Sequence, residues 1–111
     1  MHLPPSGPWS GYYLYGFGGA EHRMQLYLTF SQNGNIDGDG FDDIGEFSIR
    51  GVFDPTSREA RWTKAYVRGH SVEYRGTYDQ KCISGTWTLT IATGGFRIWP
   101  GVSAEGEEAE G

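Results

Sequence analysis

Residues 83–91 have the sequence Ile-Ser-Gly-Thr-Trp-Thr-Leu-Thr-Ile, in which polar residues alternate with apolar residues and one glycine. Successive side chains of a β-strand point to opposite faces, so this alternation predicts a strand with one buried face and one solvated face. The rest of the chain has no segment with a convincing helical period. The sequence therefore predicts an all-β protein.

The same alternation occurs at 24–30, 47–53 and 72–78, and weaker patterns predict strands at 9–17, 34–37, 58–68 and 95–99. Residues typical of turns separate these runs: Gly18-Gly19, Asn33-Gly34, Asp54-Pro55, Gly69, Asp79-Gln80 and Gly94-Gly95. Short links between seven or eight strands predict an antiparallel meander, and closing it into a barrel removes exposed strand edges. A two-sheet β-sandwich is the structural alternative. Gly51, Gly76 and Gly85 fall on the apolar side, at sites where a small barrel must bend or where an opposing aromatic ring takes the space.

The chain has 111 residues, the length of one domain. We expect an extended segment at 1–8, a barrel domain at 9–100 and a disordered acidic tail at 101–111. The tail contains four of the 14 acidic residues. The remaining ten acids face nine bases, so the folded part is nearly neutral.

Cys82 is the sole cysteine, which excludes an internal disulfide and suits a cytoplasmic protein. The chain shows no signal-peptide pattern and no apolar run near the roughly 18 residues of a membrane helix, so we expect no membrane partner. A pI near 5.0 argues against nucleic acid as a partner. We expect a monomer or weak oligomer with a small-molecule or protein partner.

Two motifs near the ends of the predicted barrel are Trp9-Ser-Gly-Tyr12 and Gly85-Thr-Trp87. Between them lies the spacing Gly38-x-Gly40-x-Asp42-x-x-Gly45-x-Phe47. This order resembles that of the calycin-like barrels, which include avidins, lipocalins and fatty-acid-binding proteins. The resemblance implies a barrel of roughly eight strands with a binding role.

One predicted strand places Trp62, Lys64 and Tyr66 on a single face, and the next run places His70 and Tyr74 together. If both faces point inward, these five residues line an apolar interior with a few polar groups, as ligand pockets do. Lys64 and His70 would then orient an anionic group. The alternative is a packed core, with Lys64 extended to the barrel mouth and His70 at a strand end.

Residues 35–46 resemble a twelve-residue calcium loop. Counted from Asn35, Asp37, Asp39, Asp43 and Glu46 occupy ligand positions 3, 5, 9 and 12, with Gly40 at position 6. The flanking segments are predicted strands rather than helices. The alternative is an acidic turn with glycines at positive φ, in which Asp42 or Asp43 accepts hydrogen bonds from backbone amides.

The sequence contains no triad, nucleophile elbow or phosphate-binding loop, so we expect no enzymatic activity. We predict a non-enzymatic binding or protein-interaction module that holds a small, partly apolar, anionic ligand. The alternative is a calcium-dependent binding module for carbohydrate, in which exposed rings would stack on the sugar. Its candidate rings are Tyr12, Tyr13, Tyr15, Trp62 and Trp99.

Overall fold

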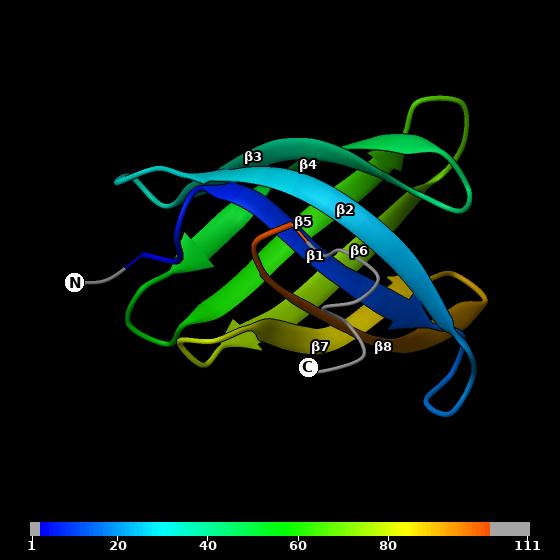
Figure 1. Ribbon diagram of the computed structural model, residues 1–111. Coiled ribbons are helices and arrows are strands. Elements are labelled where there is room, and N and C mark those ends of the chain that lie inside the picture. Colours follow the sequence, from blue (N-terminus) through cyan, green and yellow to red (C-terminus); the bar gives the residue numbers. More distant parts are fainter. Residues whose placement is uncertain (1–2, 103–111) are drawn as a thin grey trace.

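The computed structural model describes residues 3–102 and shows eight antiparallel strands in a closed barrel (Figure 1). The strands are β1 (Gly7–Leu14), β2 (Glu21–Phe30), β3 (Asn35–Asp42), β4 (Glu46–Asp54), β5 (Glu59–Tyr66), β6 (Ser71–Tyr78), β7 (Ile83–Leu89) and β8 (Ala92–Pro100). Each strand pairs with its neighbours in sequence, and β1 pairs with β8 to close the barrel. The predicted meander and its closure are confirmed, and the sandwich alternative is wrong.

Inward and outward residues alternate along most of each strand, as the period of two predicts. β6 has the regular pattern: Val72, Tyr74, Gly76 and Tyr78 are buried, and the residues that alternate with them are exposed. One continuous apolar core fills the barrel, and large aromatic rings from several strands supply much of its volume.

Inward glycines allow neighbouring strands to approach closely. A Cβ atom on Gly51 would lie 2.0 Å from the carbonyl oxygen of Arg61, and one on Gly85 would lie 2.0 Å from that of Arg75. No side chain fits at such distances, so glycine is required at both positions. The sequence predicts a bend or an opposing ring at these glycines, whereas the observed requirement at Gly51 and Gly85 is the close approach of the neighbouring strand's backbone.

Two predicted boundaries are wrong for the same reason. The strand expected at 34–37 continues to Asp42, and Gly94-Gly95 lies inside β8 rather than in a turn. At Gly38, Gly40 and Gly94 an added Cβ would collide with the backbone of a neighbouring strand. These glycines resemble turn residues in the sequence, but they serve close strand packing.

The predicted domain limits differ slightly from the observed strands. β1 begins at Gly7, inside the segment expected to precede the barrel, and β8 ends at Pro100. The predicted acidic tail lies outside the described residues apart from 101–102. Within residues 3–102, no helix is long and apolar enough to cross a membrane.

The two ends of the barrel carry different turns, which lie at the right and left of Figure 1. One end, which we name the rim end, carries the turns at 15–20, 43–45, 67–70 and 90–91. All four turns expose large apolar side chains: Tyr15, Phe17, Ile44, Val67 and Ile91. At the opposite end, named the polar end, the turns at 31–34, 55–58 and 79–82 are predominantly polar. The ends of the barrel thus differ in what they offer a partner.

Candidate functional site

Four of the five predicted interior residues converge inside the barrel. Trp62, Lys64 and Tyr66 of β5 and Tyr74 of β6 are all buried, and the Trp62 and Tyr74 rings stack with centroids 5.5 Å apart. His70 precedes β6 and is exposed in the turn at the rim end. Its ring centroid lies 5.2 Å from that of Tyr66. Tyr66 therefore links the buried residues to His70 at the rim end.

Lys64 is neutralised inside the barrel by a residue that sequence reasoning did not assign to the interior site. Its Nζ lies 2.7 Å from Oδ2 of Asp42, and both side chains are almost completely buried. The Tyr66 hydroxyl donates to the same carboxylate oxygen at 2.5 Å. The cation also lies 4.7–5.0 Å from the ring centroids of Tyr13, Phe47, Tyr66 and Tyr74. These contacts compensate for much of the cost of burying an ammonium group.

Burial governs the protonation of this cluster. Desolvation lowers the pKa of Lys64 below its ordinary value, and the hydrogen bond and charge of Asp42 oppose that shift. Desolvation also raises the pKa of Tyr66 and Tyr74, to which the negative charge of Asp42 adds. Both tyrosines consequently keep their protons even at alkaline pH where a solvated tyrosine ionises, and the Tyr66 hydroxyl remains a donor.

A second group of polar contacts lies at the rim end, beside the Lys64–Asp42 pair. Asp43 accepts a hydrogen bond of 2.7 Å from the Tyr13 hydroxyl, and its other oxygen lies 2.6 Å from Nδ1 of His22. Burial tends to raise the pKa of Asp43, but the bonds from His22 and Tyr13 outweigh it and hold that pKa below its ordinary value. Asp42 and Asp43 together tie the β3–β4 turn to β1, β2 and β5.

The predicted interior pocket is mostly filled by these side chains. A cleft of about 20 Å³ remains beside Lys64, lined by residues that include Tyr13, Ile44 and Trp87. A space of roughly 10–15 Å³ accommodates one water molecule, so this cleft is too small for an organic ligand. Lys64 is also already paired, which argues against its expected role in orienting an anion.

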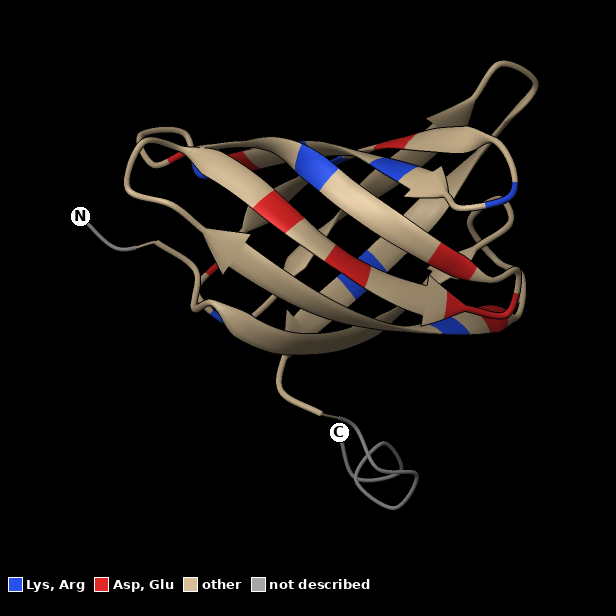
Figure 2. Ribbon diagram, turned by 90° about the horizontal axis from the view of Figure 1, so that it is seen from above, with Lys and Arg blue, Asp and Glu red and all other residues tan. Residues whose placement is uncertain are grey.

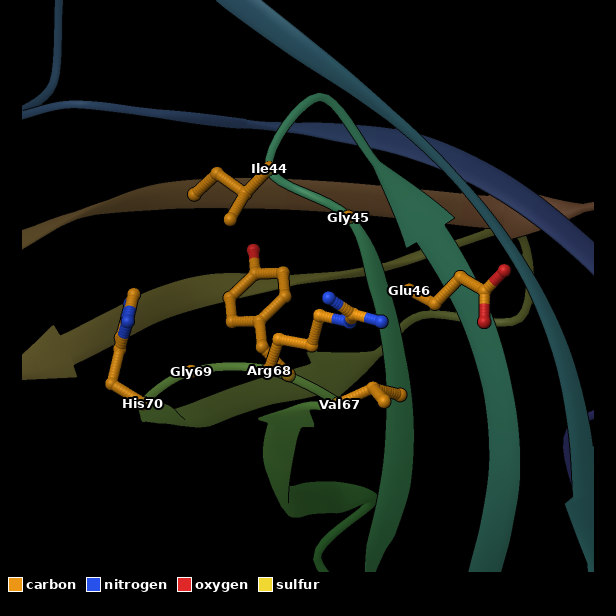
Figure 3. A pocket seen from close by; sticks show the side chains of 8 residues that line it. Ile44, Gly45, Glu46, Val67, Arg68, Gly69 and His70 are labelled. Carbon is orange, nitrogen blue, oxygen red and sulfur yellow. The ribbon is translucent and has the colours of Figure 1, made fainter.

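A larger hollow lies outside the barrel at the rim end (Figure 3). It measures about 390 Å³ and separates the β3–β4 turn from the β5–β6 turn. We name it the rim groove; its lining is Ile44, Gly45, Glu46, Tyr66, Val67, Arg68, Gly69 and His70. Figure 3 shows Ile44 and Gly45 on one turn facing the segment that carries Arg68 and His70. Apolar surface and two basic side chains therefore share one groove.

The structure does not bring the predicted calcium ligands together. Asp37 and Asp39 lie on the outer face of β3, Glu46 begins β4, and Asp43 bonds Tyr13 and His22. Residues 3–102 contain no group of three or more acidic, histidine or cysteine side chains arranged to hold a metal. The predicted twelve-residue loop is wrong in conformation, because residues 35–42 form a strand.

The alternative reading of this stretch as an acidic turn is correct for residues 42–45. Oδ1 of Asp42 accepts hydrogen bonds from the amides of Ile44 and Gly45, at 2.8 and 3.3 Å. The expectation of positive φ at the glycines holds at Gly45, in the turn, and fails at Gly38 and Gly40, which belong to β3. Asp42 thus accepts hydrogen bonds from the turn amides with Oδ1 and pairs with Lys64 through Oδ2.

The five rings considered for carbohydrate binding do not form one platform. Tyr13 and Trp62 belong to the core, whereas Tyr15 is exposed at the rim end. Tyr12 and Trp99 form an edge-to-face pair with centroids 6.1 Å apart. This separation leaves no broad stacking surface built from the set.

Sequence reasoning missed Asp42, Ile44, Val67 and Arg68 as members of the site. Asp42 has the same parity as inward Ile36, and this was the available signal. The other three lie in turns, where no period indicates which way a side chain points. Comparison of the chain with protein-family models, curated proteins and solved structures gave no match. The functional argument consequently depends on the geometry of this barrel.

Proposed function

We propose that the protein is a non-enzymatic binding module that holds a small, partly apolar anion in the rim groove. The observation that carries this proposal is the contrast between the groove of about 390 Å³ and the interior cleft of about 20 Å³. Pockets for small ligands typically span about 300–1,000 Å³. The groove has the volume that the interior lacks.

The groove lining supports a ligand with two parts. Ile44 and Val67 are exposed apolar side chains, and their burial under a hydrocarbon tail releases water. Arg68 and His70 lie on the same turn, where a carboxylate finds a guanidinium and an imidazole as hydrogen-bond donors. Glu46 at the far side disfavours a second negative charge.

We would test the proposal with octanoate, octanol and octylamine as probes of the full-length protein. Backbone amide shifts in two-dimensional NMR should report octanoate binding at residues 44–46 and 66–70, with weaker binding of octanol and weakest binding of octylamine. Arg68→Ala should lower octanoate affinity about three- to tenfold, within the range for loss of one ordinary hydrogen bond in a solvated groove. Lys81→Ala, which removes a cation from the polar end, is the matched control.

Equal affinity for octanoate and octanol would reject the anionic part of the proposal. Shifts centred on Lys64 and Trp62 would instead return the ligand to the barrel interior. Absence of shifts for all three probes would reject the small-ligand function altogether.

A further inference from the structure

The outer face of β2, β3 and β4 carries a second surface that the rim groove does not explain. Tyr27 and Phe41 are 59% and 57% exposed, and Val67 beyond β5 is 69% exposed. Phe41, Ser48 and Val67 line a hollow of about 400 Å³ together with Asp39 and Glu46. Contiguous exposed apolar surface rimmed by polar residues is a feature of protein interaction sites.

The strand register places these residues side by side. Tyr27 of β2 pairs with Asp39 of β3, which pairs with Ser48 of β4. One step nearer the rim end, Phe41 pairs with Glu46, whose carbonyl accepts the amide of Val67. We name this surface the β3 wall; its members are Tyr27, Asp37, Asp39, Phe41, Glu46, Ser48 and Val67.

The charge of the β3 wall indicates what covers it. Arg50 lies 3.8 Å from Asp37, but no cation within residues 3–102 forms an ion pair with Asp39 or Glu46. Figure 2 looks down on this side of the barrel and shows red, acidic positions along β3. Two uncompensated carboxylates beside exposed rings attract cations and repel phosphate-rich partners.

We propose that the β3 wall docks a basic segment of another protein, with arginine or lysine side chains beside Asp39 and Glu46 and aliphatic side chains in the hollow. A guanidinium placed there also reaches the faces of Tyr27 and Phe41, which favour it through cation–π attraction. The closed barrel has no free strand edge, so the segment is held by side chains rather than by strand addition.

The experiment uses the full-length protein and the blocked peptide acetyl-Arg-Leu-Arg-Leu-Arg-Leu-amide at low salt. We expect its amide-shift changes to centre on residues 27, 39, 41 and 48, with affinity falling as salt is added. A matched peptide with citrulline in place of arginine keeps the shape and removes the charge. It should bind more weakly.

Two substitutions on the β3 wall, outside the rim groove, separate this proposal from the groove. Asp39→Asn should weaken peptide binding about two- to fivefold, the range for one exposed ion pair. Phe41→Ala should weaken it at least as much, since it removes the ring and one side of the hollow. Glu73→Gln, an exposed acid on β6, should leave affinity unchanged, and octanoate binding should persist in all three variants.

Several results would overturn the proposal. Equal binding of the citrulline peptide, shifts that map to another face, or no binding at millimolar peptide would each do so. Concentration-dependent shifts of the β3 wall without peptide would identify a second copy of the chain as the occupant instead. Unchanged affinity in both Asp39→Asn and Phe41→Ala would also reject the β3 wall as the site.

Discussion

The two ends of the barrel are built in opposite ways. At the rim end, charged and hydroxyl groups lie inside, around Lys64 and Asp42, while the turns expose apolar side chains such as Ile91, which is 93% exposed. At the polar end, the interior is apolar, with Trp9, Leu28 and Ile83 fully buried, and the turns are polar. An ordinary stable end needs only the second arrangement.

The two ends therefore contribute to the stability of the barrel in different ways. The polar end stabilises the barrel by apolar burial, which is insensitive to pH. The rim end accepts the cost of a buried ion pair and exposed apolar turns, features that stability alone does not favour. Their presence together at one end supports a binding role there.

The largest expected effect comes from breaking the buried pair. Lys64→Met preserves most of the side-chain volume but leaves Asp42 as an uncompensated buried charge. We expect the free energy of unfolding to fall by about 3–5 kcal/mol, measured by urea denaturation followed by tryptophan fluorescence. The double substitution Lys64→Met with Asp42→Asn removes both charges and should recover most of this loss. If the single and double variants are equally stable, the loss in Lys64→Met does not come from leaving the Asp42 charge unpaired.

The next effect distinguishes the ends by pH. Tyrosine has an ordinary pKa of 10.0, and burial raises the pKa of Tyr13, Tyr66 and Tyr74 in the folded protein. Above that pH the unfolded chain loses these protons while the folded chain keeps them, so stability falls as pH rises. Lys64 opposes this loss of stability below pH 10.5, its ordinary pKa. Its pKa is lowered in the folded protein, so there the unfolded chain binds the Lys64 proton more tightly and stability rises with pH.

The net slope follows from counting protons. Above pH 10.5 Lys64 is deprotonated in both states and no longer opposes the loss, so each buried tyrosine that keeps its proton in the folded protein lowers stability by up to about 1.4 kcal/mol per pH unit. Urea denaturation at successive alkaline pH values measures it. Leu28→Ala, a polar-end core change expected to cost about 2–5 kcal/mol, should leave the slope unaltered. A flat profile above the tyrosine pKa would contradict the burial of these hydroxyls.

Calcium should have the smallest effect. The carboxylates of Asp37, Asp39, Asp43 and Glu46 occupy different faces and partners, so they offer no shared oxygen cage. We expect the Tm to be the same with added calcium and with chelator. A clear upward shift that Asp39→Ala abolishes would restore the calcium-dependent module as the better account of the rim end.

Much of the fold follows from the period of two. The runs around Leu26, Ile49, Tyr74 and Trp87 alternate strongly, and each forms a strand. The sequence predicts a strand that ends at residue 37, whereas β3 continues to Asp42. Its inward positions after Ile36 are Gly38, Gly40 and Asp42, which lack the apolar side chains of a buried face. Close backbone packing, rather than side-chain burial, selects those residues, and single-sequence periodicity does not detect it.

The candidate site was harder to predict than the fold. Parity placed Trp62, Lys64 and Tyr66 together, but it gave no partner for Lys64, because Asp42 lies 22 residues away on another strand. Whether a barrel interior is open or filled depends on ring orientation, which the sequence does not record. The rim groove and the β3 wall involve turn residues and outward side chains, where patterns carry the least information.

The closure of the barrel has a consequence for protein engineering. The amide of Gly101 donates to the carbonyl of Pro8 at 2.7 Å, so the chain enters and leaves the fold at adjacent points of the polar end. A host protein can therefore receive this barrel in one of its surface loops, with little separation required between the two graft points. In such a chimera the rim groove faces away from the host, because the graft points lie at the opposite end of the barrel.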